Sequence, residues 1–234
     1  MPTPAPTSNI TDLPWAEFKS YFFRQWQQGE HVSLIGPTGQ GKTSLALELL
    51  PRREFVVALG TKPRDATLAQ LQKQGYKRIS KWNDRKLQHR LLLWPPISHE
   101  KDTTGQYKEF TYALNQMYGQ GRWTIFIDEA RYFAEMLRMR RLLILLWTQG
   151  RSNKITVVAG CQRPAFVPTE IYDQATHIFF WGDNDDNNLK RIGGIGSLNA
   201  KEVKQAVAEL PKFHILYLNT RTNEMIRTKV ELKK

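Results

Sequence analysis

Short apolar runs recur along the chain, and each has the length of a buried strand. They cover residues 31–35, 55–59, 89–94, 123–127, 155–159 and 176–180. The segments between them are rich in helix formers or have apolar residues at helical spacing, as at 44–50, 66–74, 110–118 and 130–147. Strands that alternate with helices predict an α/β fold with a mainly parallel sheet and helices on both faces.

The remaining segments have other patterns. Residues 1–12 are rich in Pro and Thr and predict a flexible N-terminal tail, and 98–106 is a polar loop without periodicity. Residues 13–28 have aromatic side chains at helical spacing, which favours packing on the core over stacking on bases. The apolar segments 213–219 and 224–230 predict a C-terminal β-hairpin, 213–230, at the sheet edge. We expect one domain over 13–234.

The charge balance is strongly basic, with 34 Lys and Arg against 22 Asp and Glu, a net charge of +12. This excess favours a polyanionic partner such as nucleic acid, although it could also be a solubilising surface charge. Cys161 is the only cysteine, which excludes a disulfide framework. The start has no leader pattern, and the longest apolar run, 142–147, is too short to span a bilayer. We expect a soluble, intracellular protein.

A complete phosphate-binding loop, GPTGQGKT, follows the first apolar run and precedes a helical segment. Its backbone N–H groups would face the phosphates of ATP at a helix N-terminus. Lys42 would reach the β- and γ-phosphates, and the Thr43 hydroxyl would ligate Mg²⁺. The predicted nucleotide-binding residues are Gly36, Pro37, Thr38, Gly39, Gln40, Gly41, Lys42, Thr43 and Ser44.

Two adjacent carboxylates, Asp128 and Glu129, end the apolar run 123–127. Parallel strands converge at their carboxyl ends, so both acids can reach a triphosphate bound at the loop. Asp128 would hold Mg²⁺, and Glu129 would orient and deprotonate the attacking water. The alternative is a pair that only stabilises a helix N-terminus. Gln162, at the end of the run 155–159, is placed to sense the γ-phosphate, and Arg163 could act likewise.

The second half of the site resembles the HerA/FtsK superfamily of DNA-pumping ATPases. The resemblance rests on the acidic pair, the helical segment after it, QGRSNKI at 149–155, VVA at 157–159 and QRP at 162–164. It extends from about residue 30 to 194 and includes the segment 185–194. It implies a RecA-like P-loop NTPase core of the ASCE type.

The same resemblance implies roles for individual residues. Lys42 and Thr43 would bind nucleotide and Mg²⁺, Asp128 and Glu129 would serve metal and water, and Gln162 would be the sensor. Arg151 would reach into the neighbouring subunit's site, which implies a homo-oligomeric ring, either a hexamer or a pentamer. Competing candidates for this arginine are Arg138, Arg140 and Arg141, and Arg151 could instead be a cation at a helix C-terminus.

The resulting expectation is an ATP-driven, ring-forming translocase of double-stranded DNA, most like a compact viral genome-packaging ATPase. A capsid portal or vertex protein is the candidate partner, and the host cytoplasm or the virion vertex is the expected location. A nucleotide-dependent switch and a small-molecule kinase are the alternatives. DNA contacts would go mainly to phosphates. Candidate DNA-binding residues, each of which could equally be an ordinary solvated surface charge, are Lys62, Arg64, Lys101, Lys108, Lys190 and Arg191.

Overall fold

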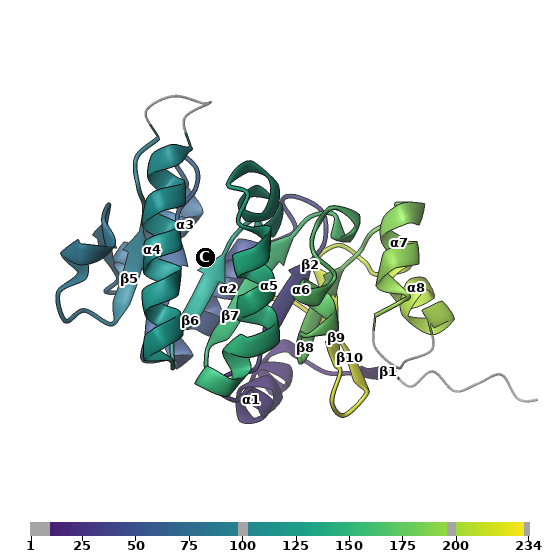
Figure 1. Cartoon of the computed structure of the whole chain (residues 1–234). Helices are drawn as coiled ribbons and strands as arrows, with labels where there is room; N and C mark the ends of the chain where they lie inside the picture. The colour runs from purple at the N-terminus through teal and green to yellow at the C-terminus, as the bar shows by residue number, and fades with distance from the viewer. Residues whose placement is uncertain (1–9, 98–102, 196–199, 232–234) are drawn as a thin grey trace, which may run out of the picture.

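The protein is built around a single mixed sheet (Figure 1). The computed structural model describes residues 10–97, 103–195 and 200–231. Within these residues the sheet has ten strands in the order β1-β10-β9-β8-β2-β7-β6-β3-β5-β4. The strands are β1 (Ile10–Asp12), β2 (Val32–Ile35), β3 (Val56–Leu59), β4 (Lys77–Ile79), β5 (Arg90–Leu93), β6 (Thr124–Ile127), β7 (Thr156–Cys161), β8 (His177–Trp181), β9 (His214–Asn219) and β10 (Glu224–Lys229).

The strands from β8 to β4 in this order are all parallel, whereas β9 and β10 form an antiparallel hairpin beside β8. Central strands such as β2, β3 and β6 are buried along their whole length, which explains their continuous apolar sequences. β7 lies between β2 and β6, the strand order of the predicted ASCE type. The predicted mainly parallel sheet is confirmed.

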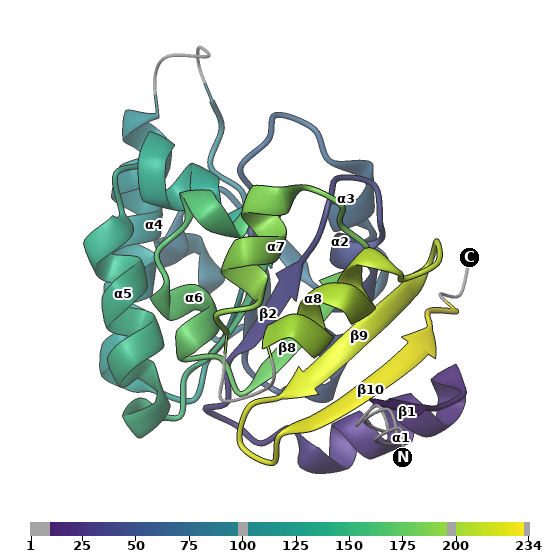
Figure 2. The ribbon, with the colours of Figure 1, turned by 90° about the vertical axis from the view of Figure 1, so that its right-hand side faces the viewer.

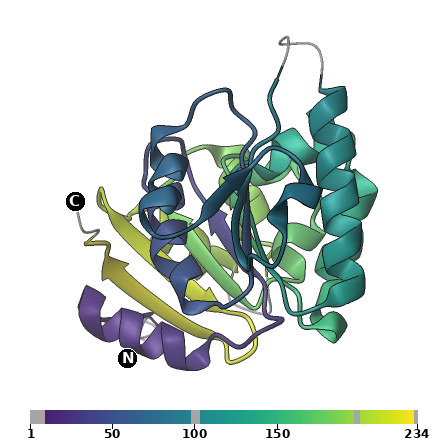
Figure 3. The ribbon, with the colours of Figure 1, turned by 90° about the vertical axis from the view of Figure 1, so that its left-hand side faces the viewer.

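Helices cover both faces of the sheet and give two apolar cores (Figure 3). One face packs against α1 (Trp15–Gln25), α2 (Lys42–Leu49) and α3 (Ala66–Lys73). The other packs against α4 (Thr104–Gln120), α5 (Arg140–Gln149), α6 (Glu170–Asp173), α7 (Asp186–Ile192) and α8 (Ala200–Ala208). Short 3₁₀ helices cover Leu50–Arg52, Trp82–Arg85, Gly150–Asn153 and Pro164–Phe166. No helix in the described ranges is long and apolar enough to cross a membrane.

The N-terminal boundary differs from the prediction. Ile10–Asp12, expected to be part of the flexible tail, form β1 and pair with β10, so β1 lies outside the C-terminal hairpin (Figure 2). Arg227 holds this edge by donating two hydrogen bonds to the Asp12 carboxylate, at 2.6 and 2.8 Å. The rest of the predicted tail, residues 1–9, lies outside the described residues. The hairpin itself is confirmed.

The helix predicted over 130–147 is interrupted. Tyr132–Met136 form a π-helix, in which the Leu137 N–H donates to the Tyr132 carbonyl at 3.0 Å. Arg138 then adopts a left-handed conformation with φ 53°, and α5 starts only at Arg140. The predicted loop 98–106 also needs correction, because α4 already starts at Thr104 and residues 98–102 lie outside the described ranges.

Candidate nucleotide-binding site

The phosphate loop connects the carboxyl end of β2 to the first turn of α2. Gly39 and Gly41 have φ values of 78° and 94°, a left-handed conformation that favours glycine. The Gly36 N–H donates to the Cys161 carbonyl at 3.0 Å, which fixes the start of the loop to the end of β7. The loop therefore presents a helix N-terminus, which binds anions, beside a cavity of about 280 Å³.

Lys42 is the buried cation of this cavity. Its ammonium donates to the carbonyl oxygens of Gly36 and Pro37, at 2.6 and 2.7 Å. Burial lowers the pKa of Lys42, and the nearby carboxylates Glu129 and Asp128 oppose this effect. A buried ammonium hydrogen-bonded to neutral carbonyls gains from an anion at close range, so Lys42 is suited to bind phosphate.

Asp128 and Thr43 meet at the base of the cavity, where the Thr43 hydroxyl donates to Asp128 Oδ1 at 2.6 Å. One carboxylate and one hydroxyl fit Mg²⁺, which is commonly bound by one or two carboxylates together with substrate phosphates and water. Among the described residues, no cluster of three or more His, Cys, Asp or Glu side chains could hold a metal. Asp128 and Thr43 supply one carboxylate and one hydroxyl, a donor set that fits an ion bound together with a nucleotide.

Glu129 lies at the same edge as Asp128 and is hydrogen-bonded to Gln162. Burial raises the pKa of Glu129, although the Arg131 N–H and Lys42 oppose this. The Gln162 side chain also accepts a hydrogen bond from the Thr38 hydroxyl, at 2.8 Å. A carboxyl group with a raised pKa is a better proton acceptor, and Gln162 connects it to the phosphate loop.

Two residues of the site were missed by sequence reasoning. Gly160, in β7, lies so close to β6 that any Cβ atom would overlap the Asp128 carbonyl oxygen. The glycine at a strand end was its only signal in the sequence. Lys62, a candidate DNA contact in the sequence, forms an ion pair with Asp128 at 2.9 Å and lines the phosphate cavity, a position that the sequence did not predict. No local pattern relates it to Asp128, because β3 and β6 pair only in the sheet.

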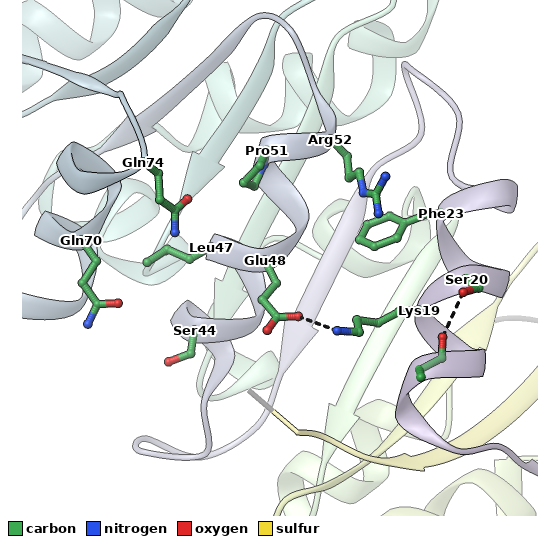
Figure 4. A pocket seen from close by; sticks show the side chains of 11 residues that line it. Lys19, Ser20, Phe23, Ser44, Leu47, Glu48, Pro51, Arg52, Gln70 and Gln74 are labelled. Carbon is green, nitrogen blue, oxygen red and sulfur yellow. Dashed lines mark hydrogen bonds and ion pairs between the residues drawn. The ribbon is translucent and has the colours of Figure 1, made fainter. Parts of the chain in front are cut away.

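A larger groove of about 920 Å³ lies between α1, α2 and α3 (Figure 4). Its charged side chains are paired with neighbours: Lys19 with Glu48 at 3.4 Å, and Arg52 over the Phe23 ring at 4.3 Å. Ser44, in the first turn of α2, lines both this groove and the phosphate cavity. The phosphate loop and Asp128 nevertheless line the smaller cavity, which is the candidate site.

Comparison with solved structures places the fold. The chain is similar to the genome packaging NTPase B204 of Sulfolobus turreted icosahedral virus 2 bound to sulfate, at 17% identity and a TM-score of 0.68, covering 89% of this chain and 100% of that one. The chain has the P-loop ATPase fold. The B204 complex with ATP-gammaS gives a TM-score of 0.69 at 15% identity, covering 88% and 100% of the two chains.

A second class of P-loop ATPase also matches. The conjugation coupling protein TcpA of pCW3 aligns at 14% identity and a TM-score of 0.54, covering 88% of this chain and 61% of that one. No protein-family model matches the sequence, and no curated protein matches it. At these identities the likeness concerns the fold, so residue roles depend on the geometry described above.

Arg151 lies away from the candidate nucleotide-binding site of its own subunit. It lies in the 3₁₀ helix after α5, where its backbone carbonyl approaches Gly29. Gly29 precedes β2, so Arg151 is at the amino end of the parallel strands, with its side chain exposed. Its competitors Arg138, Arg140 and Arg141 lie between the π-helix and the first turn of α5 and are also exposed.

The other basic residues predicted to contact DNA have different surroundings. Arg64, Lys108, Lys190 and Arg191 are exposed. Arg191 lies over the Tyr172 ring, with 6.0 Å between the guanidinium and the ring centroid. Lys101 lies outside the described residues. These four exposed residues remain predicted contacts to DNA phosphates. Lys62 differs from them because it is ion-paired with Asp128.

Proposed function

We propose that the chain is an Mg²⁺-dependent ATPase that moves double-stranded DNA. The observation that carries this proposal is that Lys42, Thr43 and Asp128 line one cavity at a helix N-terminus, with Glu129 next to Asp128 and hydrogen-bonded to Gln162 of the same cavity. Glu129 favours hydrolysis over a nucleotide-dependent switch, because a partly buried carboxylate beside the phosphate loop is suited to act as the base for water attack. The similarity to a packaging NTPase and to a coupling protein supports DNA as the substrate.

Each residue of the site has its own role in the proposed hydrolysis of ATP. Lys42 and the loop N–H groups bind the β- and γ-phosphates, while Thr43 and Asp128 hold the metal ion. Bound Mg²⁺ neutralises negative charge on the phosphates. Glu129 accepts a proton as water attacks the γ-phosphorus, and the bond to the ADP oxygen breaks. Gln162 is hydrogen-bonded to both Glu129 and Thr38, so loss of the γ-phosphate beside it can change the conformation of the phosphate loop.

The proposal extends to assembly and location. The net charge of +12 favours sequence-independent contacts with DNA phosphates. We propose a homo-oligomeric ring in which Arg151 of one subunit acts on the next subunit's nucleotide, as the resemblance to DNA-pumping ATPases implies. A role in viral genome packaging would place this ring in the host cytoplasm or at a virion vertex, with a portal or vertex protein as its partner.

The deciding experiment measures ATP hydrolysis with and without long duplex DNA while light scattering reports the size of the complex. A DNA-pumping ring predicts DNA-stimulated hydrolysis by an oligomer. A switch predicts slow hydrolysis that DNA does not change, and a kinase predicts stimulation by a small phosphate acceptor. A monomer that hydrolyses ATP at full rate on DNA would contradict the ring.

Salt provides a second measurement on the same complex. With several phosphate contacts, DNA affinity should fall by about 10³-fold or more between 50 and 200 mM salt, because binding releases counterions. Duplexes of unrelated sequence should bind equally well. Affinity that ignores salt, or that follows one base sequence, would contradict a motor that tracks the DNA backbone.

A further inference from the structure

Lys62 places a second cation in the phosphate cavity. It follows β3 in the chain, and its ammonium lies 2.9 Å from Asp128 Oδ2 and 3.1 Å from Asp65 Oδ2. Asp65 is also the N-cap of α3, where its Oδ1 accepts from the Leu68 N–H at 2.9 Å. The carboxylate of Asp128 is therefore shared between Lys62 on one oxygen and Thr43 on the other.

Two side chains from other parts of the fold hydrogen-bond to the backbone next to the Lys62 side chain. The Trp94 indole N–H donates to the Lys62 carbonyl at 2.6 Å, and Gln106 of α4 donates to the Thr61 carbonyl at 3.0 Å. The Trp94 ring packs so closely on Gly60 that a Cβ atom there would be 2.7 Å from it. These contacts fix where the side chain starts, as a preorganised site requires.

The side chain of Lys62 has solvent on one side, into which its ammonium can move away from Asp128. It is 54% exposed, although its ammonium contacts Asp128. When a divalent ion binds Asp128, an ammonium at the same carboxylate is repelled unless an anion compensates. The phosphates that arrive with the metal supply this anion, and a small rotation of a flexible lysine is enough to follow them.

We propose that Lys62 is a second phosphate-binding cation of the nucleotide site, which holds Asp128 in the nucleotide-free protein and contacts the terminal phosphate of a bound triphosphate. The inference rests on the proposed function, because it requires the cavity to bind a nucleoside triphosphate with Mg²⁺. It replaces the DNA contact that the sequence predicted for Lys62.

The test compares two nucleotides on three variants. Equilibrium binding of fluorescent ADP and of a non-hydrolysable fluorescent ATP analogue is measured with Mg²⁺ for wild type, Lys62→Met and Lys62→Arg. Loss of a charged hydrogen bond should weaken binding of the triphosphate analogue by about ten-fold or more in Lys62→Met. Binding of ADP should change by less than about two-fold (~0.4 kcal/mol), because ADP lacks the terminal phosphate that Lys62 is proposed to contact. Lys62→Arg should recover most of the triphosphate affinity, since it keeps the charge.

Lys19→Met is the matched control, because Lys19 is also ion-paired with a glutamate but lies in the groove between α1 and α2. It should leave both affinities unchanged, and thermal unfolding shows whether each variant is folded. Equal weakening of both nucleotides, or unchanged affinities with weaker DNA binding, would overturn the inference while wild-type hydrolysis leaves the proposed function in place. A wild-type protein that binds neither nucleotide would overturn both.

Discussion

The two ends of the parallel sheet both contain charged side chains at low exposure, but they use them differently. At the amino end, Glu30 accepts hydrogen bonds from His177 and Arg221, at 3.0 and 2.8 Å. The other ring nitrogen of His177 lies 2.8 Å from the Tyr217 hydroxyl, which completes a network within the protein. At the carboxyl end, the direct partners of the Lys42 ammonium among the described residues are neutral carbonyls, and Asp128, although ion-paired with Lys62, lines a cavity.

The two ends of the sheet therefore differ in whether their charged side chains face each other within the protein or face a cavity. The hydrogen bonds and the ion pair of Glu30 hold the segment before β2, β8 and the C-terminal hairpin together within the protein. Charged side chains that line a cavity can contact a ligand there, as at many functional sites. Substitutions at the amino end should therefore change stability, whereas those at the carboxyl end should change binding and turnover.

Substitution of Arg151 has the largest expected effect on ATP hydrolysis. It is also the strongest test of this comparison, because Arg151 lies at the amino end of the sheet. If it acts on a neighbouring subunit, Arg151→Ala should reduce ATP hydrolysis by about 10³-fold while nucleotide binding is retained. Steady-state hydrolysis and nucleotide binding are measured on assembled protein. The amino end of one subunit would then complete the site of the next.

Mixed assemblies decide whether the arginine acts between subunits. Arg151→Ala and Glu129→Gln subunits, each inactive alone, should partly restore hydrolysis together, because some interfaces combine an intact site with an intact arginine. Arg140→Ala is the matched control, since it changes an exposed arginine of α5. Absence of recovery in verified mixed assemblies argues against action in trans, and an effect of Arg140→Ala alone would transfer the role to that residue.

The next effect in size concerns Glu129. Glu129→Gln should lower turnover by about 100-fold, the usual contribution of a general base, because the amide cannot accept the proton of water. Nucleotide affinity should remain close to wild type, since Lys42 and Thr43 are unchanged. Single-turnover hydrolysis and equilibrium binding separate the two effects. Near-normal turnover would exclude Glu129 as the base.

The parts of this site that are local in sequence could be predicted from it. The phosphate loop and the acidic pair are contiguous motifs, and apolar runs located most of the parallel strands. The ion pair of Lys62 with Asp128 depends on β3 lying beside β6, and the need for Gly160 depends on β7 lying beside β6. The helix predicted over 130–147 was interrupted because a helical pattern does not reveal a π-helix followed by a left-handed Arg138.

At the amino end, Glu30→Gln tests the structural half of the comparison. Replacing the charged acceptor of this network should lower the free energy of unfolding by about 2 kcal/mol, because the buried His177 and the half-exposed Arg221 lose their anionic partner. Denaturant unfolding measures this change, and nucleotide affinity of the folded variant should be unaltered. The control is Glu17→Gln, an exposed carboxylate of α1. A Glu30 variant with normal stability and weaker nucleotide binding would contradict the comparison.

The smallest expected effect is the pH dependence of stability. Burial lowers the pKa of His177 from its ordinary 6.5, against the effect of Glu30. Burial opposes ionisation of Glu30, but His177, the Gln27 N–H and Arg221 together lower its pKa from 4.5 to about 2. Both groups bind protons more readily in the unfolded chain, so acidification below pH 6.5 favours unfolding, first through His177 and then through Glu30 between pH 4.5 and about 2.

Each such group contributes at most about 1.4 kcal/mol per pH unit to the slope. Denaturant unfolding from pH 7 to pH 3 should therefore show falling stability in wild type and a shallower fall in Glu30→Gln below pH 4.5. Glu17→Gln should follow the wild-type curve. Parallel curves for wild type and Glu30→Gln would mean that Glu30 binds protons equally in both states, and the network at the amino end would then not be the closed, charge-stabilised structure described here.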